Sequence, residues 1–552
     1  METPYGDIPE KFVKDMSIQE MHDYLKARSS RRAFLMGAGA LGLAAAAGPV
    51  FWRQSSAFAS TASAPQWVGY GRDPAREMYV SWSAGTYNGP VPSVPAPQVR
   101  YGLDATYGAT EKAVFSGTVP VPAITGEPVE NTVYSNALLC NLRPDTVYHY
   151  SVSNDGVNWS DDVTFRTAAA GLSDFRFTMV GDEATSDASS LPVAQIIAAM
   201  KPRFNVVVGD LSYAGGGSGY YSNGVPTGVS SFSPGAWDAY LGIVGPAAAQ
   251  SIPWQVGVGN HEMEPLADFG YVGFTTRFPQ AYASSSESGS PVVKAFTYGN
   301  VAVIQPDGND LSAEISDNNG YTEGKQTSWL ERKLREYRSP GSGIDFIIVG
   351  FHNMVYSSNT THGSDGGIRL VWQPLFDRYQ VDLVVNGHVH AYERTYPIRG
   401  SGVTKTVPSG GTVHPEHDGT TYIGAGGGGQ DLYTGWYGVT GAGDPANTSG
   451  PPLIWEWSGS DTATGGTGTA NDITDPVADY SAYRHANWSF ISLDVKAPRF
   501  YGDETSILVR AIDPIQTASG ITSVSGPVVM DSVKLVRRAR FDHAFGGGRH
   551  HR

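Results

Sequence analysis

The segment Asp382–Arg394 reads DLVVNGHVHAYER, and it decides the fold of the larger part of the chain. A β-prone apolar run stops at Gly387, and His388 and His390 follow at once. Two imidazoles two residues apart point the same way from an extended chain. We therefore expect a strand whose end presents two metal-type ligands on one side.

Four more segments have the same design, an apolar run that stops at a glycine or at a side chain bearing oxygen or nitrogen. They are FTMVGD ending at Asp182, FNVVVGDLSY with Asp210 and Tyr213, WQVGVGNH with Asn260 and His261, and FIIVGFH ending at His352. Any one of them alone is more often a turn or a core histidine than a ligand. If all five runs are strands of one sheet, their ends converge on one rim, where open α/β sheets bind ligands. The set then predicts a dinuclear metal site, and its oxygen and imidazole donors suit iron, manganese or zinc.

The region from Trp67 to Thr167 reads as all β. Runs such as EMYVSWSA and TVYHYSVSND are rich in Tyr, Val, Thr and Trp and are separated by turn residues. Leu142–Tyr148, LRPDTVY, resembles the corner of fibronectin type III domains, where the Tyr packs and hydrogen-bonds. We expect a β-sandwich with a structural role, then a linker at 168–171. Strands alternate with helices beyond it, and helices are predicted over 191–200 and 325–337. The predicted fold class is α+β.

The N-terminus has the pattern of an export signal. Ser29–Leu35, SSRRAFL, is followed by the apolar, Ala/Gly-rich stretch MGAGALGLAAAAGPVFW, and together they resemble a twin-arginine signal. Cleavage is expected after Ala59 or Ala64; a membrane-anchoring helix is the alternative. The pattern predicts a chain exported folded by the twin-arginine machinery, to the periplasm, the cell wall or the medium. It would keep no stable membrane span after processing.

Composition narrows the function classes. The chain of 552 residues has a formal net charge of −15, which is poorly suited to binding nucleic acid non-specifically. It has a single cysteine, Cys140, so no intrachain disulfide can form. Its place in the strand-like run SNALLCNL predicts burial as a small hydrophobe. The glycine run Gly426–Gly429 lacks the Lys-Ser/Thr of a P-loop, which favours a tight structural turn.

Several motifs together resemble one known family. GD at Asp182, GDLSYA around Asp210, GNHE at Gly259–Glu262, the later His352 and GHVHAYER after Asn386 occur in the order found in purple acid phosphatases, which are calcineurin-like metallophosphoesterases. The β-sandwich in front matches the plant-type members. The resemblance covers most of the mature chain. It implies a two-sheet βαβ sandwich flanked by helices and a secreted acid phosphatase that hydrolyses phosphate monoesters.

The resemblance also implies a ligand set. A first metal, expected to be Fe(III), would be held by Asp182, Tyr213 and His390. A second divalent metal, expected to be Zn, Mn or Fe, would be held by Asn260, His352 and His388, with Asp210 bridging the two. Metal-bound hydroxide would be the nucleophile.

The residues facing the substrate depart from the family pattern. His261 resembles the substrate-facing histidine, and His362 is assigned as a leaving-group acid or phosphate binder. Thr361 stands where plant members have a second histidine, and Asp365 where they tend to have Glu. Asp182 is followed by Glu183-Ala184, where a Gly is usual after one spacer. These changes leave the predicted metal ligands intact. They alter residues expected to set the substrate and the pH optimum, so neither property can be carried over from the plant members.

The predicted organisation is a signal region at 1–64, a fibronectin III-like sandwich at 65–168, a catalytic domain at 172–500, C-terminal strands closing it at 501–536, and a basic tail at 537–552. Two other functions stay open. One is a phosphodiesterase or nucleotide hydrolase on the same scaffold. The other is a non-catalytic cell-wall binding protein with a relict metal site. The expected partners are small phosphate esters, and the sequence does not indicate an oligomeric state.

Overall fold

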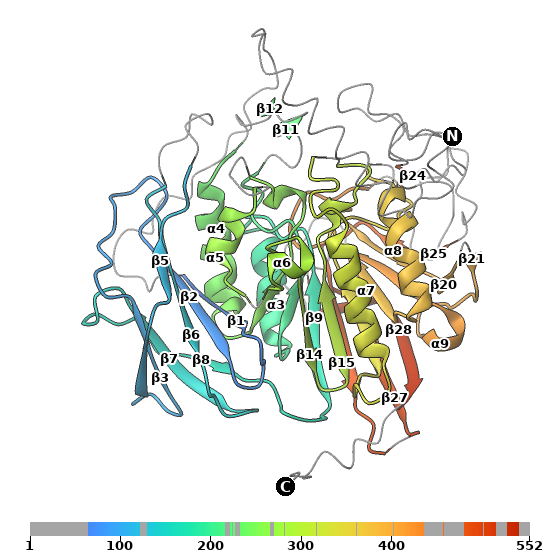
Figure 1. Cartoon of the computed structure of the whole chain (residues 1–552), viewed down its shortest axis with the longest axis horizontal. Coiled ribbons are helices and arrows are strands. Elements are labelled where there is room, and N and C mark those ends of the chain that lie inside the picture. Colours follow the sequence, from blue (N-terminus) through green and yellow to red (C-terminus); the bar gives the residue numbers. More distant parts are fainter. Residues whose placement is uncertain are drawn as a thin grey trace.

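The computed structural model describes most of the chain between residues 65 and 539 (Figure 1). The described residues are 65–539 except 122–129, 216–220, 223–224, 227–231, 265–269, 281, 316, 360, 401, 435, 437–455, 458–479, 501 and 515–526. The predicted export signal, both cleavage sites and the tail from 540 lie outside the described residues. Among the described helices, none is both long enough and apolar enough to cross a membrane.

The N-terminal domain is a sandwich of two four-stranded antiparallel sheets, on the left of Figure 1. One sheet contains, in spatial order, β1 (Gln66–Tyr70), β2 (Met78–Ala84), β6 (Val133–Leu139) and β5 (Phe115–Gly117); the other contains β4 (Gly108–Lys112), β3 (Gln98–Gly102), β7 (Val147–Ser153) and β8 (Val163–Arg166). The predicted corner is formed: Tyr148 is buried against Phe165, with ring centroids 5.7 Å apart, and its hydroxyl accepts a hydrogen bond from the Arg143 amide at 2.9 Å.

The domain predicted to be catalytic, called the catalytic domain below, contains two seven-stranded mixed sheets. The first has the order β13 (Trp254–Val256), β10 (Asn205–Val207), β9 (Phe175–Val180), β26 (Phe490–Lys496), β27 (Glu504–Asp513), β28 (Val528–Arg538) and β22 (Gly411–Val413). The second has the order β14 (Lys294–Tyr298), β15 (Val301–Gln305), β16 (Phe346–Gly350), β18 (Leu383–Asn386), β23 (Thr421–Ala425), β19 (Tyr392–Thr395) and β25 (Ser481–His485). β28 runs to Arg538, so the chain stays in the sheet two residues beyond 536, the predicted end of the closing strands.

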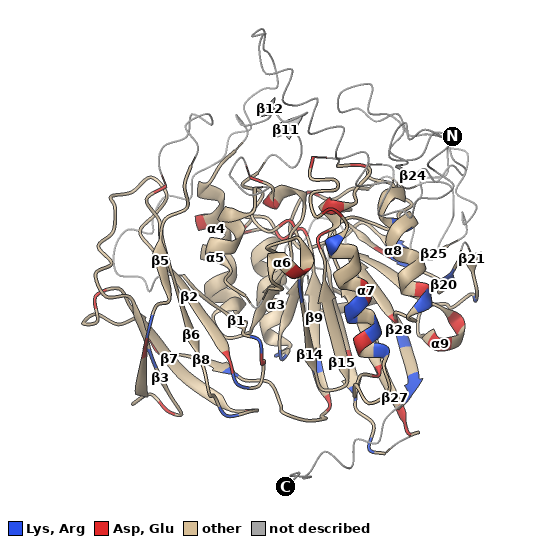
Figure 2. Ribbon diagram, viewed as in Figure 1, with Lys and Arg blue, Asp and Glu red and all other residues tan. Residues whose placement is uncertain are grey.

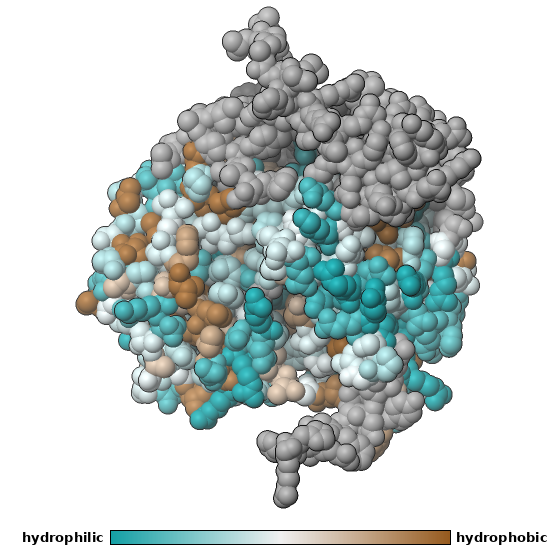
Figure 3. Space-filling view, viewed as in Figure 1, coloured by the Kyte–Doolittle hydropathy of each residue, from teal (hydrophilic) through white to brown (hydrophobic). Residues whose placement is uncertain are grey.

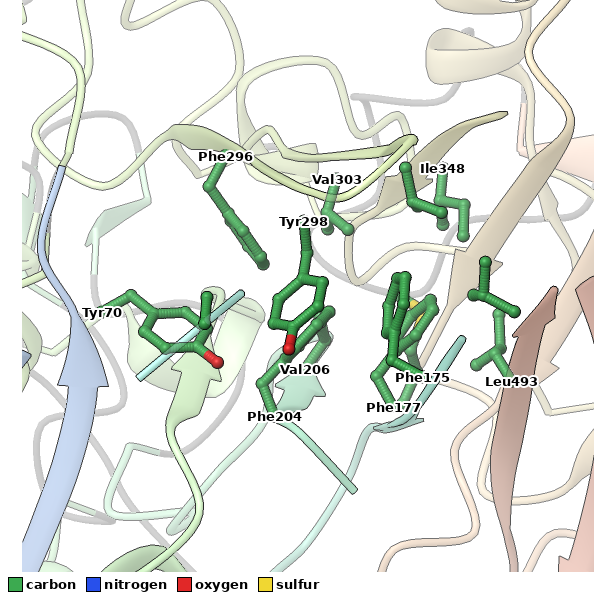
Figure 4. Packing of buried hydrophobic residues seen from close by; sticks show 14 of the residues in the cluster. Tyr70, Phe175, Phe177, Phe204, Val206, Phe296, Tyr298, Val303, Ile348 and Leu493 are labelled. Carbon is green, nitrogen blue, oxygen red and sulfur yellow. The ribbon is translucent and has the colours of Figure 1, made fainter. Parts of the chain in front are cut away.

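The premise that the five motif strands share one sheet is wrong. β9, β10 and β13 are parallel neighbours in the first sheet, whereas β16 and β18 are parallel neighbours in the second. The ends still meet, because the two sheets pack face to face. The first sheet contributes Phe177 and Val206, together with Phe204 directly before β10. These side chains pack with Tyr298, Val303 and Ile348 of the second sheet (Figure 4).

Aromatic rings fill much of the space between the sheets. Phe177 stacks on Phe204 with ring centroids 4.8 Å apart, and Phe204 meets Phe296 edge to face at 5.4 Å. Such pairs stabilise by about 0.5–1.5 kcal/mol beyond the burial of their area. Tyr70 of β1 joins the same cluster, with its ring 6.0 Å from Phe204, so one core runs from the sandwich into the catalytic domain (Figure 4).

Helices cover the outer faces of both sheets. α3 (Ser190–Ala199), α4 (Gly235–Val244) and α5 (Val272–Arg277) pack with Val180, Val207 and Val256 on the first sheet. α7 (Lys325–Arg338) and α8 (Gly366–Arg378) pack with Ile304, Ile347 and Val384 on the second. The remaining short elements are the π-turn Gly245–Ala249, the 3₁₀ turns η4 (Asn260–Glu262) and η6 (Gly308–Asp310), α6 (Ser285–Ser288), α9 (Pro415–Asp418), β11 (Tyr221–Ser222), β12 (Val225–Pro226), β17 (Ser364–Asp365), β20 (Ile398–Arg399), β21 (Gly402–Val403) and β24 (Glu456–Trp457).

Both helices predicted from sequence are present, as α3 and α7. The face of α7 turned to the sheet buries Trp329, Leu330 and Leu334. Its opposite face carries charges of both signs (Figure 2), and this is the most hydrophilic part of the surface seen in Figure 3. Most of the hydrophobic residues visible in Figure 3 are scattered over the left side of the view, where the sandwich lies.

A buried ion pair joins the two domains. Arg277 at the end of α5 donates to both carboxylate oxygens of Glu130, at 3.0 and 2.9 Å, and both side chains are fully buried. Its guanidinium lies between the rings of Tyr134 and Trp237, 4.8 and 4.7 Å from their centroids. The Trp237 indole in turn donates to Glu264 at 2.5 Å. The sandwich is therefore coupled to the loop that follows η4.

Cys140 is exposed, so the expected burial is wrong. It follows the last residue of β6, Leu139, which is buried. The apolar run forms strand β6 as expected, but Cys140 lies just beyond its end and is exposed to solvent.

Candidate metal centre

The ends of the motif strands carry an unusual backbone. Asp182, Asp210, Tyr213 and His388 all have left-handed φ angles, of 60°, 52°, 55° and 71°. Residues other than glycine rarely adopt this region, and such strain concentrates at functional sites where the surroundings enforce it. Four of the seven predicted metal ligands therefore lie on sharp turns that point them away from their strands.

Hydrogen bonds between the loops enforce these turns. The Asp182 amide donates to Gly209 O at 3.1 Å, and the His388 amide donates to Asp182 Oδ2 at 2.9 Å. Gly387 lets the loops approach, since a Cβ there would lie 2.7 Å from Asp182 Oδ2 and 2.9 Å from His352 Nδ1. The loops after β9, β10, β16 and β18 form one interlocked layer above the two sheets.

Asp182, Tyr213 and His390 bring three donor atoms together. The Tyr213 hydroxyl lies 3.1 Å from Asp182 Oδ1 and 3.1 Å from His390 Nε2, and the last two atoms are 3.4 Å apart. Metal–ligand bonds of about 2.0–2.2 Å place neighbouring ligand atoms about 3 Å apart. His390 Nδ1 lies 2.7 Å from Asp431 O, to which it donates, so its Nε2 lone pair faces the triangle. The three atoms fit one side of a metal ion.

Asp210, His352 and His388 form a further group able to hold a cation, and Glu314, His362 and His388 also lie close enough together to do so. His352 donates from Nδ1 to Val208 O at 3.0 Å, which turns its Nε2 toward Asp210 Oδ2, 3.0 Å away. Burial lowers the pKa of His352, but the carboxylates of Asp210 and Asp182 outweigh it and raise that pKa to about 9. These carboxylates favour a positive charge at this point, and a bound metal would take the place of the proton. The donor set fits a metal pair.

Asp210 lies between the groups, as a bridging ligand requires. Its Oδ1 accepts a hydrogen bond from the His261 amide at 2.9 Å, while its Oδ2 faces His352. Asn260 is buried at the start of η4, next to His261. All seven predicted ligands thus come from loops that meet at one rim of the paired sheets.

The sequence matches known families over both domains. Residues 68–167 match the family described as Purple acid Phosphatase, N-terminal domain, and residues 176–392 match Calcineurin-like phosphoesterase. An uncharacterised protein of Mycobacterium tuberculosis is 31% identical over 440 residues, which are 72% of this chain and 78% of that protein. Purple acid phosphatase 23 of Arabidopsis thaliana is 27% identical over 354 residues, 60% of this chain and 74% of the plant protein.

The chain belongs to the purple acid phosphatase family.

A solved structure agrees on the fold. The purple acid phosphatase from yellow lupin seeds has a TM-score of 0.60 and 19% identity, and the match covers 87% of this chain and 75% of the lupin chain. The predicted family, fold class and enzyme class are confirmed. The protein is a phosphatase with a dinuclear metal centre.

His261 lies beside Asp210 in this phosphatase site, whereas His362 lies beside His388. His261 donates from Nδ1 to Gly215 O at 2.6 Å, and its Nε2 is 3.8 Å from Asp210 Oδ2. His362 Nδ1 lies 2.5 Å from Glu314 Oε1, and its ring is 4.1 Å from that of His388. Each of the two histidine side chains is 22% exposed, whereas His352, His388 and His390 are buried, so these two are the histidines that a substrate can reach.

Glu262 was part of a recognised motif but had no predicted role. Its buried carboxylate accepts hydrogen bonds from the amides of Asp210, Leu211 and Gly259, at 2.8, 2.8 and 2.7 Å. It therefore clamps the loop of the bridging Asp210 to the loop of Asn260. Burial and the nearby Asp210 raise its pKa to about 8.

Glu314 and Tyr433 were missed by sequence reasoning. Glu314 lies between His362 and His388, with an oxygen directed at each. The Tyr433 ring stacks on that of His390, with centroids 4.1 Å apart, and lies 5.2 Å from the ring of His362. Both residues come from irregular segments without a motif, so only the folded chain places them.

Two of the departures from the family pattern prove to be structural. Asp365 was expected to be the acidic residue near His362, but it caps α8 through the amides of Gly367 and Ile368 and accepts from Ser312 Oγ at 2.7 Å. Glu314 contacts His362 instead. Glu183 points into the core, where it accepts from the Tyr240 hydroxyl at 2.6 Å, and burial raises its pKa to about 7.

The glycine run after β23 packs against the same loops. A Cβ on Gly426 would lie 2.2 Å from Val389 O and 2.6 Å from Asp182 Oδ2. A close structural turn, as the sequence favoured, accounts for the run.

Proposed function

We propose that this protein is an exported phosphomonoesterase with an Fe(III)–M(II) centre, M being Zn, Mn or Fe. The observation that carries the proposal is the triangle of Tyr213 Oη, Asp182 Oδ1 and His390 Nε2, with sides of 3.1, 3.1 and 3.4 Å. A phenol in this position adds a ligand that favours a ferric ion. The fourfold set of Asp210, Asn260, His352 and His388 would serve the divalent ion, with Asp210 shared.

The environment of Tyr213 supports a highly charged first ion. Burial, together with the carboxylates of Asp182 and Asp210, raises the pKa of Tyr213 well above its ordinary value. A phenolate could therefore form here only if a strong positive charge offset those carboxylates. Fe(III) supplies more charge than a divalent ion, and phenolate coordination would give it a visible charge-transfer band.

The metals and the protein would divide the work. When bound, the two ions neutralise charge on the phosphoryl oxygens and lower the pKa of a water molecule that acts as the nucleophile. Asp210 would be the ligand shared by the two ions. His261 and His362 are both partly exposed and would bind the phosphoryl group. His362 has Nε2 available for the leaving oxygen, because its Nδ1 is directed at Glu314.

One observation favours phosphodiesters as the alternative substrates. Thr361 is exposed and neutral where a second histidine was expected, so it adds no cation beside the leaving group. A diester carries less negative charge than a monoester and would lose less from this change. The rates of hydrolysis of a phosphate monoester and a phosphate diester must therefore be compared to decide between the two substrate classes.

Export by the twin-arginine route is also part of the proposal. The Ser29–Leu35 motif and the apolar stretch after it support export, and a single cysteine is compatible with a chain that folds before it crosses the membrane. Folding first would allow the metals to be loaded inside the cell.

Turnover of p-nitrophenyl phosphate and its bis ester, measured at pH values from about 4 to 8 on protein of known metal content, tests the substrate class. We expect the monoester to have the higher kcat/KM. A clear preference for the diester would replace the monoesterase assignment with the alternative. No hydrolysis of either by metal-loaded protein would favour the non-catalytic binding protein.

A further inference from the structure

Glu314 makes two histidine contacts that no motif predicted. Its Oε1 lies 2.5 Å from His362 Nδ1, and its Oε2 lies 3.0 Å from His388 Nε2. The side chain is only 7% exposed, so both oxygens are committed to these imidazoles in a dry environment. One of the two histidines is a predicted metal ligand, and the other faces the substrate.

These contacts fix which nitrogen of each ring donates to Glu314. A carboxylate accepts hydrogen bonds, so His388 must donate from Nε2 and His362 from Nδ1. His388 then offers Nδ1, and only Nδ1, as a lone pair to the divalent metal. His362 keeps Nε2 for the substrate, and as an imidazolium it gives the Nε2 proton to the leaving oxygen while Nδ1 still donates to Glu314. The same kind of control is seen at His352 and His390, where a backbone carbonyl accepts from Nδ1 instead.

The position of Glu314 is itself supported by α8. Asp365, at the N-terminus of that helix, accepts hydrogen bonds from the Ser312 hydroxyl at 2.7 Å and from the Ala313 amide at 3.0 Å. The Glu314 amide also approaches Asp365 Oδ2, at 3.5 Å. The segment 312–314 is thus held against the helix, and Glu314 projects from it into the site.

We propose that Glu314 is a positioning residue that couples the second metal site to the leaving-group histidine. Through His388 it orients a ligand of the divalent metal, and through His362 it orients the proposed acid. The His362 part rests on the proposed phosphatase function, whereas the His388 part concerns metal binding alone. Partners of this kind typically change metal affinity or activity by about 10–100-fold when they are removed.

The test uses the full chain with Glu314→Gln, which keeps the shape but cannot accept from both rings. Glu323→Gln is the matched control, because it removes an exposed carboxylate from the same connection before α7. Zn²⁺ affinity of the second site is measured by chelator competition on protein stripped of its divalent ion. We expect affinity to weaken about 10–100-fold in Glu314→Gln and to stay unchanged in the control.

The second readout is the dependence on the leaving group. Turnover of phenyl phosphate, a poor leaving group, should fall at least about tenfold more than that of 2,4-dinitrophenyl phosphate, a good one. In a His362→Ala background, Glu314→Gln should still weaken Zn²⁺ binding but should no longer change the ratio of the two rates. A residue that only supported the fold would lower both rates together.

Unchanged Zn²⁺ affinity in a folded Glu314→Gln protein overturns the proposal. So does an unchanged ratio of the two rates in an active enzyme. If Glu314→Gln does not fold, Glu314→Asp serves, because it keeps the charge but is one methylene too short to reach both rings. A wild-type protein without phosphatase activity would refute the proposed function, and the Zn²⁺ measurement would still decide the role of Glu314 at His388.

Discussion

The phenol oxygen of Tyr213 lies 3.1 Å from Nε2 of His390, although the two residues are 177 positions apart in the chain. Asp182 Oδ1 completes the group at 3.1 Å from the same phenol oxygen. A single phenol proton cannot satisfy both acceptors. The arrangement suits one metal ion shared by the three side chains better than a hydrogen-bond network. The assignment of the first metal site depends on this geometry.

Tyr213→Phe should abolish the visible band of the iron-loaded protein and spare much of its turnover. A phenyl ring cannot donate charge to Fe(III), whereas Asp182, Asp210 and His390 would still hold the ion. The visible spectrum and the iron content, measured on one preparation, check this. A variant that retains both iron and its full band would show that another group is the chromophore.

His362→Ala should lower kcat for phenyl phosphate by about 10²-fold or more, in the range usual for the loss of a general acid. The effect should be much smaller for 2,4-dinitrophenyl phosphate, whose leaving group needs no proton. Steady-state kinetics with the two esters measure it. An equal fall for both esters would make His362 a phosphate binder rather than an acid.

Glu262→Ala should destabilise the protein and empty the metal site. It removes the acceptor of three amides, those of Asp210, Leu211 and Gly259. A buried donor left unsatisfied costs about 1–3 kcal/mol, so a loss of at least about 3 kcal/mol is expected. Urea unfolding and metal analysis test both effects, with Glu323→Gln as the exposed control. Normal stability and metal content in Glu262→Ala would mean that water accepts the three amide hydrogen bonds in place of the carboxylate.

Arg277→Ala should destabilise the protein by about 3–5 kcal/mol, because it leaves the buried carboxylates of Glu130 and Glu264 without their cation. Arg335→Ala is the control. It breaks an exposed pair with Glu331, and such pairs contribute about 0–1 kcal/mol. Equilibrium unfolding in urea compares the two variants. Equal effects would argue that the sandwich is not held by this ion pair.

Glu183→Gln should change how stability depends on pH. The pKa of Glu183 is raised to about 7 in the folded protein. Its carboxyl group therefore contributes stability that is fully present below its unfolded pKa of about 4.3 and is lost as pH rises through 7. The variant lacks this dependence and should gain about 3 kcal/mol relative to wild type between about pH 4.5 and 8. Parallel unfolding curves of the two proteins, with a constant difference across this range, would contradict the raised pKa.

Much of the site could be predicted from local patterns. Each predicted metal ligand lies in the loop that follows a strand, so the hydrophobic run that forms the strand also indicates where the ligand lies. The assumption of one sheet failed because alternation and length say where a strand is, not which strand it pairs with. β10 and β16 lie in different sheets although their sequences, FNVVVG and FIIVG, are nearly alike.

The residues around the metals were harder to predict. Glu314 and Tyr433 reach the site from irregular segments, and their contacts span 74 positions to His388 and 43 to His390. Asp365 shows the opposite error: it lies three residues after His362, but the start of α8 takes its carboxylate. The match to the family's acidic position near His362 decided that prediction, whereas in the structure Asp365 caps a helix.

The central claim is that Asp182, Tyr213 and His390 hold a ferric ion beside a divalent one. Its most direct test is metal analysis together with a visible spectrum of the purified wild-type protein. We expect about one iron and one further divalent metal per chain, with a visible band that Tyr213→Phe removes. Protein that contains two metals, one of them ferric iron, but has no such band would contradict it.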